Sequence, residues 1–113
     1  MSRIHYPECL VAVEATADRD RFECDDAEVW IEEESILISY FDDDGIVVLE
    51  GSPEKATDTS EATFGAWTLS ARSRPWRAFL RPMDEAPGTY SGEIDEHGEI
   101  AVWRLRLGEP ELK

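Results

Sequence analysis

Short apolar runs separated by turn signals constrain the fold of this chain most strongly. Apolar residues alternate with polar ones or form brief runs, and clusters of Gly, Pro, Asp and Ser interrupt them about every 8–12 residues, a spacing typical of all-β proteins. Val, Ile, Thr and aromatic residues dominate the runs, as strands prefer. No segment predicts a long helix. The expected strands cover residues 9–16, 20–24, 27–33, 35–41, 46–50, 63–72, 76–81, 88–94 and 99–107.

Two turns separate expected strands with particular clarity. Residues 42–45 (DDDG) and 95–98 (DEHG) each end in Gly, which can take the positive φ that closes a three-residue hairpin with a bulge. Consecutive hairpins form a meander. We therefore predict an all-β fold, an antiparallel meander of about 7–8 strands that forms a small barrel or a two-layer sandwich.

The chain is long enough for one domain with its own core. Its length is 113 residues, and 42 % of them are hydrophobic, far more than an acidic disordered tail contains. We expect a single all-β domain over residues 1–113. Trp30 is expected either in this core or in a contact. The predicted core comprises Val11, Val13, Val29, Ile31, Ile38, Val48, Trp67, Leu69, Leu80, Trp103, Leu105 and Leu107.

Charge is distributed unevenly along the chain. Residues 1–71 hold 18 acidic and 4 basic residues, whereas residues 72–113 hold 8 acidic and 7 basic ones, and the net charge is −15. This balance argues against nucleic acid and anionic membranes as partners, because both are bound through basic surfaces. A contact between the acidic first part and the arginines of the second part is compatible with it.

The cysteines and histidines give no sign of a metal or a cofactor. Cys9 and Cys24 lack a CxxC partner, and His5 and His97 lie far apart, so we expect neither. The N-terminus lacks the apolar run of a signal peptide, so we expect a cytoplasmic location and reduced thiols rather than a disulfide. No Ser or Cys stands in a nucleophile motif; we assign no catalytic residue and favour a non-catalytic role.

The hairpin expected over residues 35–50 is apolar on both faces. Alternation places Ile38 and Tyr40 on one face and Leu37 and Phe41 on the other, and residues 46–49 repeat this pattern. Such a hairpin needs cover on its outer face from residues 51–62, from the N-terminal residues or from another subunit; we favour a second subunit. The expected oligomer face comprises Trp30, Leu37, Phe41, Val47 and Leu49.

An arginine-rich segment begins the second part of the chain. Residues 72–81 (RSRPWRAFLR) hold four Arg and no acid, and two further Arg alternate with apolar residues in the last expected strand. Guanidinium groups bind carboxylates and stack on aromatic rings. We favour ion pairs across strands, with Glu93, Glu99 or acids of the first part, over a recognition patch for an anionic ligand, a partner or a second copy. The candidate patch comprises Arg72, Arg74, Arg77, Phe79, Arg81, Arg104 and Arg106.

Residues 65–67 (GAW) resemble the short G-x-W pattern of lipocalin-like barrels, in which the Trp closes one end of the barrel beneath an Arg of the last strand. The resemblance implies that Trp67 closes a barrel and that Arg104 or Arg106 lies over it. In that family the pattern opens the first strand, whereas here only three expected strands follow it. The match therefore indicates barrel closure and not membership of the family.

Three functions of different classes remain open. The favoured one is a non-catalytic domain that acts through protein contacts, most simply as a homodimer. The second is a small-ligand-binding barrel with an arginine-lined anion site and a pocket lined by Trp67, Trp76, Tyr90 and Trp103. The third is an acidic mimic of DNA or an immunity-type inhibitor that binds a basic protein, for which residues 18–44 would form one negative face.

Overall fold

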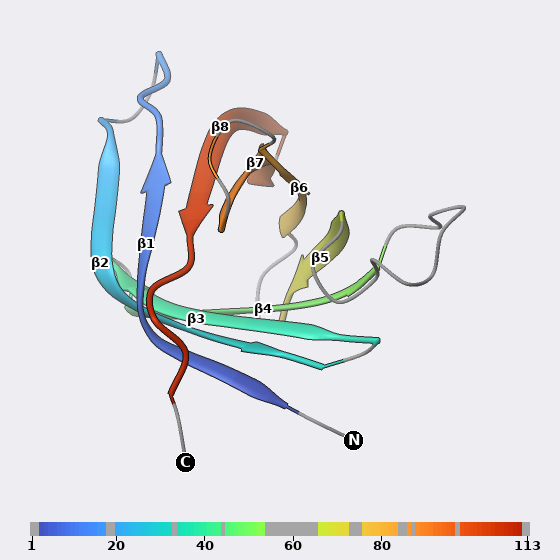
Figure 1. Cartoon of the computed structure of the whole chain (residues 1–113). Coiled ribbons are helices and arrows are strands. Elements are labelled where there is room, and N and C mark those ends of the chain that lie inside the picture. The colour runs from blue at the N-terminus through green and yellow to red at the C-terminus, as the bar shows by residue number, and fades with distance from the viewer. Residues whose placement is uncertain are drawn as a thin grey trace.

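The structure is a computed structural model that describes residues 3–17, 20–32, 34–43, 45–53, 66–72, 76–83, 86, 88–96 and 98–111 (Figure 1). It contains eight strands, and the described ranges hold no helix and thus none able to cross a membrane. The strands are β1 (Ile4–Val13), β2 (Phe22–Ile31), β3 (Ile36–Asp42), β4 (Gly45–Pro53), β5 (Trp67–Ala71), β6 (Trp76–Pro82), β7 (Thr89–Glu96) and β8 (Glu99–Arg106).

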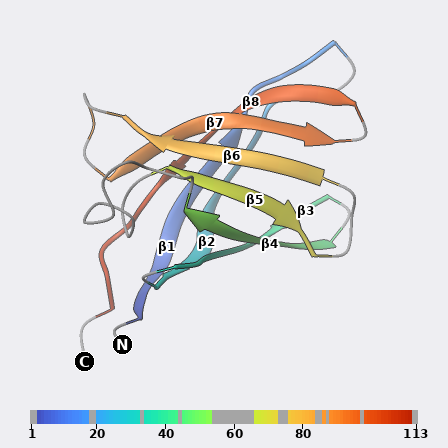
Figure 2. The same ribbon diagram turned by 90° about the vertical axis from the view of Figure 1, so that its right-hand side faces the viewer.

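The strands form a closed barrel in chain order. Each strand pairs antiparallel with the next, and β8 closes the ring on β1, where Leu10 pairs with Arg106 and Val13 with Trp103 (Figure 2). The predicted antiparallel meander is confirmed, and of the two predicted forms the barrel is the one adopted. Because β8 pairs with β1, neither terminal strand remains a free edge strand, which is how a small all-β domain limits edge-to-edge aggregation.

The expected strands 20–24 and 27–33 are one continuous strand, β2. Between the pairs Cys9–Ala27 and Val11–Cys24, β2 advances by one residue more than β1, which is a β-bulge. The bulge leaves Asp25 and Asp26 both exposed. The adjacent acids therefore mark an irregularity within a strand and not, as we predicted, a break between two strands.

Both predicted hairpins occur with glycine at positive φ. Gly45 has φ 121° and Gly98 has φ 89°. The residue pairs Asp42–Gly45 and Glu96–Glu99 leave two residues in each loop, so the loops are tighter than the predicted three-residue hairpins. Asp95 supports the second turn, because its Oδ1 accepts a hydrogen bond of 2.9 Å from the Gly98 N–H.

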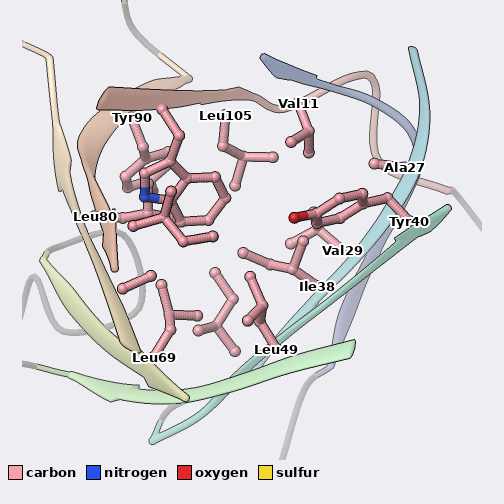
Figure 3. Close-up of a cluster of buried hydrophobic side chains, with 14 of the residues drawn as sticks. Val11, Ala27, Val29, Ile38, Tyr40, Leu49, Leu69, Leu80, Tyr90 and Leu105 are labelled. Atoms are coloured by element: carbon pink, nitrogen blue, oxygen red, sulfur yellow. The ribbon is translucent and has the colours of Figure 1, made fainter. Parts of the chain in front are cut away.

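The interior of the barrel holds one hydrophobic core, to which all eight strands contribute (Figure 3). Most of the predicted core residues are buried, but two are not. Val48 lies half-buried on the outer face while Val47 and Leu49 point inward, with 2 % and 0 % exposure. Leu107 is partly buried and packs against the core. The error at Val48 is one of parity: residues 46–49 are all apolar, so alternation alone does not tell inside from outside.

Candidate functional site

Four arginines lie exposed on the outer surface of strands β6 and β8. In β6 they alternate with the buried residues Trp76, Ala78 and Leu80, as predicted. Ser91 of β7 stands between the two strands, opposite both Arg81 and Arg104. A small side chain thus separates two guanidinium-bearing positions in one row. The exposed arginines are Arg77, Arg81, Arg104 and Arg106.

Within the described chain, an ion pair of the favoured kind occurs at Arg72. Arg72 pairs with Glu50, and Arg74 lies outside the described residues. Arg104 and Arg106 have no acidic partner within 4.0 Å among the residues that the structure describes. Arg81 lies over the Phe79 ring at 5.2 Å from its centroid. The guanidinium groups of β8 are therefore available for contact.

Exposed apolar side chains accompany these arginines. Ile100 and Val102 of β8 are 58 % and 45 % exposed. In the register they lie opposite Asp95 and Glu93 of β7, so acids are present beside them as well. We call this surface the arginine face, and define it by Arg77, Arg81, Ile100, Val102, Arg104 and Arg106.

A second exposed apolar surface lies on the β3–β4 hairpin. Phe41 and Ile46 pair across the two strands and are 64 % and 52 % exposed. Leu37 and Val48 lie half-buried on the same side, so the predicted outer apolar face exists, but Val47 and Leu49 of the proposed oligomer face belong to the core. We call this surface the hairpin face, and define it by Leu37, Phe41, Ile46 and Val48.

The hairpin face has an acidic rim. Asp43 follows Phe41 closely in the chain, and the two exposed carboxylates of the β2 bulge, Asp25 and Asp26, lie on the neighbouring strand. The Cys24 thiol beside this bulge contacts the backbone of Phe41, which places the bulge next to the apolar pair. The surface therefore combines an apolar centre with carboxylates around it.

Trp30, the remaining residue of the predicted oligomer face, is covered within the chain. The His5 ring stacks on its indole with centroids 4.7 Å apart and an angle of 3° between the planes. His5 is held in turn by Glu111, whose carboxylate lies 2.6 Å from Nδ1 and whose N–H donates to the His5 carbonyl at 2.7 Å. The C-terminal segment is thus bound to β1 through His5. Trp30 is half-buried, and one face of its indole is covered by the His5 ring.

The predicted tryptophan pocket is part of the core. Trp67 and Trp103 are fully buried and Trp76 is nearly so, and the Trp103 indole N–H donates to the Phe79 carbonyl at 3.3 Å. These three indoles fill the barrel. Arg104 and Arg106 point outward, so neither covers Trp67 as the G-x-W resemblance implied.

Tyr90, a member of that predicted set, lines a pocket. The pocket has a volume of about 510 Å³ and lies at the end of the barrel where β6 turns into β7. Tyr6, which sequence reasoning did not single out, lines it as well. A second hollow, of about 350 Å³, lies outside the barrel beside Trp30 and Leu37.

The two cysteines are free and are poor nucleophiles. Burial raises the pKa of the Cys9 thiol. Burial also raises the pKa of Cys24, and Asp26, which accepts a hydrogen bond from its Sγ at 2.7 Å, raises it further. Both shifts disfavour the reactive thiolate. Within the described ranges no three His, Cys, Asp or Glu side chains come together as a metal site.

Comparisons with family models, with curated proteins and with solved structures found no match to this chain. The site residues are therefore interpreted from their own geometry. Sequence reasoning missed Ile46, Ile100 and Val102 as surface residues. The sequence did indicate an outer position for Ile100 and Val102, because they alternate with Ala101 and Trp103. No sequence signal pointed to Tyr6.

Proposed function

We propose that this protein is a non-catalytic domain that associates with further copies of itself, the hairpin face of one copy docking on the arginine face of the next. The observation that carries the proposal is the presence of two exposed apolar surfaces with different charged rims on one barrel. Exposed carboxylates of Asp25, Asp26 and Asp43 lie near Phe41 and Ile46. Exposed arginines of β6 and β8 share the outer surface with Ile100 and Val102, which lie opposite Asp95 and Glu93. Apolar burial would supply affinity, and the complementary charge would set orientation.

The position of the two faces favours a head-to-tail arrangement. The hairpin face lies on β3 and β4 and the arginine face on β6 and β8, so the two faces occupy different parts of the closed ring (Figures 1 and 2). Each contact between two copies therefore leaves one hairpin face and one arginine face unused, and the assembly extends until it closes as a ring. A symmetric dimer through two hairpin faces would instead oppose carboxylates to carboxylates.

Two variants, each with one face removed, test this arrangement. Phe41→Ser combined with Ile46→Ser removes the apolar centre of the hairpin face, and Arg104→Glu reverses charge in the arginine face. Light scattering should give each variant alone the mass of one 12.8 kDa chain. Mixed in equal amounts, they should form a 1:1 heterodimer through the one intact face of each. Added salt should weaken this dimer, because exposed charges are screened.

Arg21→Glu is the matched control, since it makes the same charge change at an exposed arginine outside both faces, paired with Glu23 at 2.7 Å. It should assemble as the unaltered protein does. A monomeric unaltered protein at every concentration and salt would contradict the proposal. So would a mixture of the two variants that stays monomeric, and so would a stable complex with a basic protein that either variant leaves intact.

A further inference from the structure

The pocket at the β6–β7 end of the barrel is built by segments from three parts of the chain. Tyr6 of β1 and Tyr90 of β7 line it from the barrel, and the ends of β6 and β8 form its walls. Backbone hydrogen bonds fix these walls: the Met83 N–H donates to the Thr89 carbonyl at 2.9 Å, and the Leu107 N–H to the Gly88 carbonyl at 2.8 Å. The volume of about 510 Å³ lies within the range of small-molecule sites.

Tyr6 belongs to the lining of this pocket and carries a hydroxyl that no described residue satisfies. Tyr6 is only 7 % exposed, and among the residues that the structure describes its hydroxyl accepts and donates no hydrogen bond. A ligand that brings an acceptor to this hydroxyl would gain a hydrogen bond in a largely buried setting.

Both tyrosines remain hydrogen-bond donors at neutral pH. Burial raises the pKa of Tyr90 to about 12, and the neighbouring Tyr6 contributes to the shift. Burial also raises the pKa of Tyr6. The phenols therefore stay protonated and offer O–H groups rather than phenolate oxygens.

The lining favours an uncharged ligand. Its described residues are Tyr, Pro, Met, Gly, Thr and Leu, so they offer neither a cation nor a carboxylate to compensate a ligand charge. Arg81 and Arg106 precede wall residues in the chain but are exposed, and they lie on the outer surface. A buried charge without a partner is costly. The anion site expected from the arginines is therefore not this pocket.

We propose that this end of the barrel binds a small, mostly apolar, uncharged molecule whose carbonyl oxygen accepts a hydrogen bond from the Tyr6 hydroxyl. Met83 and Leu107 would contact the apolar body, and Tyr90 would close the inner wall of the site. The pocket includes no residue of the hairpin face or the arginine face, so this site stands independently of self-association.

Acetophenone is a suitable probe, with ethylbenzene as its counterpart without a carbonyl and benzoate as its anionic counterpart. In amide-resolved NMR titrations, acetophenone should shift the signals of Gly88, Thr89, Leu107 and Gly108 and saturate with a dissociation constant on the order of 1 mM. Ethylbenzene and benzoate should each bind more weakly.

Tyr6→Phe removes only the hydroxyl and should weaken acetophenone binding about three- to tenfold while leaving ethylbenzene binding unchanged. Tyr40→Phe is the matched control: Tyr40 of β3 is as deeply buried and lies beside Phe22 and, in Figure 3, on the other side of the core from Tyr90. It is not among the lining residues, so removal of its hydroxyl should not alter affinity. The proposal is overturned if acetophenone does not shift the pocket signals saturably, if benzoate binds more tightly, or if Tyr6→Phe and Tyr40→Phe have equal effects.

Discussion

The β3–β4 and β7–β8 hairpins of this barrel are built alike inside and differently outside. Each is closed by a two-residue loop with glycine at positive φ, and each directs one apolar row into the common core. Outside, the first presents Phe41 and Ile46 among carboxylates, and the second presents Ile100 and Val102 beside arginines. The comparison shows that core packing decides which residues of a strand point inward. It leaves the residue types of the outer row unconstrained, so these can serve in contacts.

Substitution of the inward-facing glycines should give the largest difference in stability between the β7–β8 side and the β3–β4 side of the barrel. A Cβ built on Gly92 of β7 would lie 1.6 Å from the Phe79 carbonyl oxygen, whereas one on Gly51 of β4 would lie 2.7 Å from that of Thr68. Gly92→Ala should therefore cost about 3 kcal/mol or more of the free energy of unfolding, and Gly51→Ala about 1–2 kcal/mol. Urea denaturation measures both. Equal costs would show that β6 and β7 can separate as readily as β4 and β5.

The next largest effect concerns which residues of the β3–β4 hairpin face the core. Leu49 is fully buried and its neighbour Val48 is half-buried on the outer face. Leu49→Ala should destabilise the fold by about 2–5 kcal/mol, because it leaves a cavity, and Val48→Ala by about 1 kcal/mol or less. Thermal unfolding of the two variants distinguishes them. The reverse order would restore the sequence-based assignment of Val48 to the core.

Alkaline pH should destabilise the arginine side through Tyr90. Its folded-state pKa of about 12 lies above the ordinary value of 10.0, so the unfolded chain loses this proton first. The contribution of Tyr90 to the free energy of unfolding is therefore fully present below pH 10. It is lost as pH rises from 10 to 12, by about 2–3 kcal/mol in total. Tyr90→Phe should abolish that part of the pH dependence in urea titrations. An unchanged slope in this variant would assign the loss to other groups.

The smallest effect concerns exposed charge. Glu50 pairs with Arg72 at the edge of the hairpin side, and both side chains are more than half exposed. Glu50→Gln should change the free energy of unfolding by about 0.2–1 kcal/mol, and 1 M salt should remove the difference. Glu93 of β7 forms no ion pair with another described residue, so Glu93→Gln should have no such salt-sensitive effect. Equal, salt-sensitive losses would indicate that Glu93 does neutralise the arginines.

Much of the fold and part of the candidate site could be predicted from local pattern. The turn glycines, the meander and the outward arginines of β6 and β8 follow from alternation and turn chemistry, which act over a few residues. The bulge at Asp25 and Asp26 was not predicted, because a bulge is a property of two paired strands. The Tyr6–Tyr90 pocket was not predicted either, because its two tyrosines come from strands far apart in the chain.

The sequence by itself determined that this protein is an all-β meander with an acidic first part and arginines on an outer face. Side-chain alternation is a property of each strand, and it can be interpreted wherever only one face is apolar, as in residues 103–106 of β8. Only the tertiary structure decided that Val47 and Leu49 face inward and that β8 closes on β1. It also decided that Tyr6 and Tyr90 line the same pocket. Where both faces of a strand are apolar, the register with neighbouring strands selects the buried one, and that register exists only once the barrel has closed.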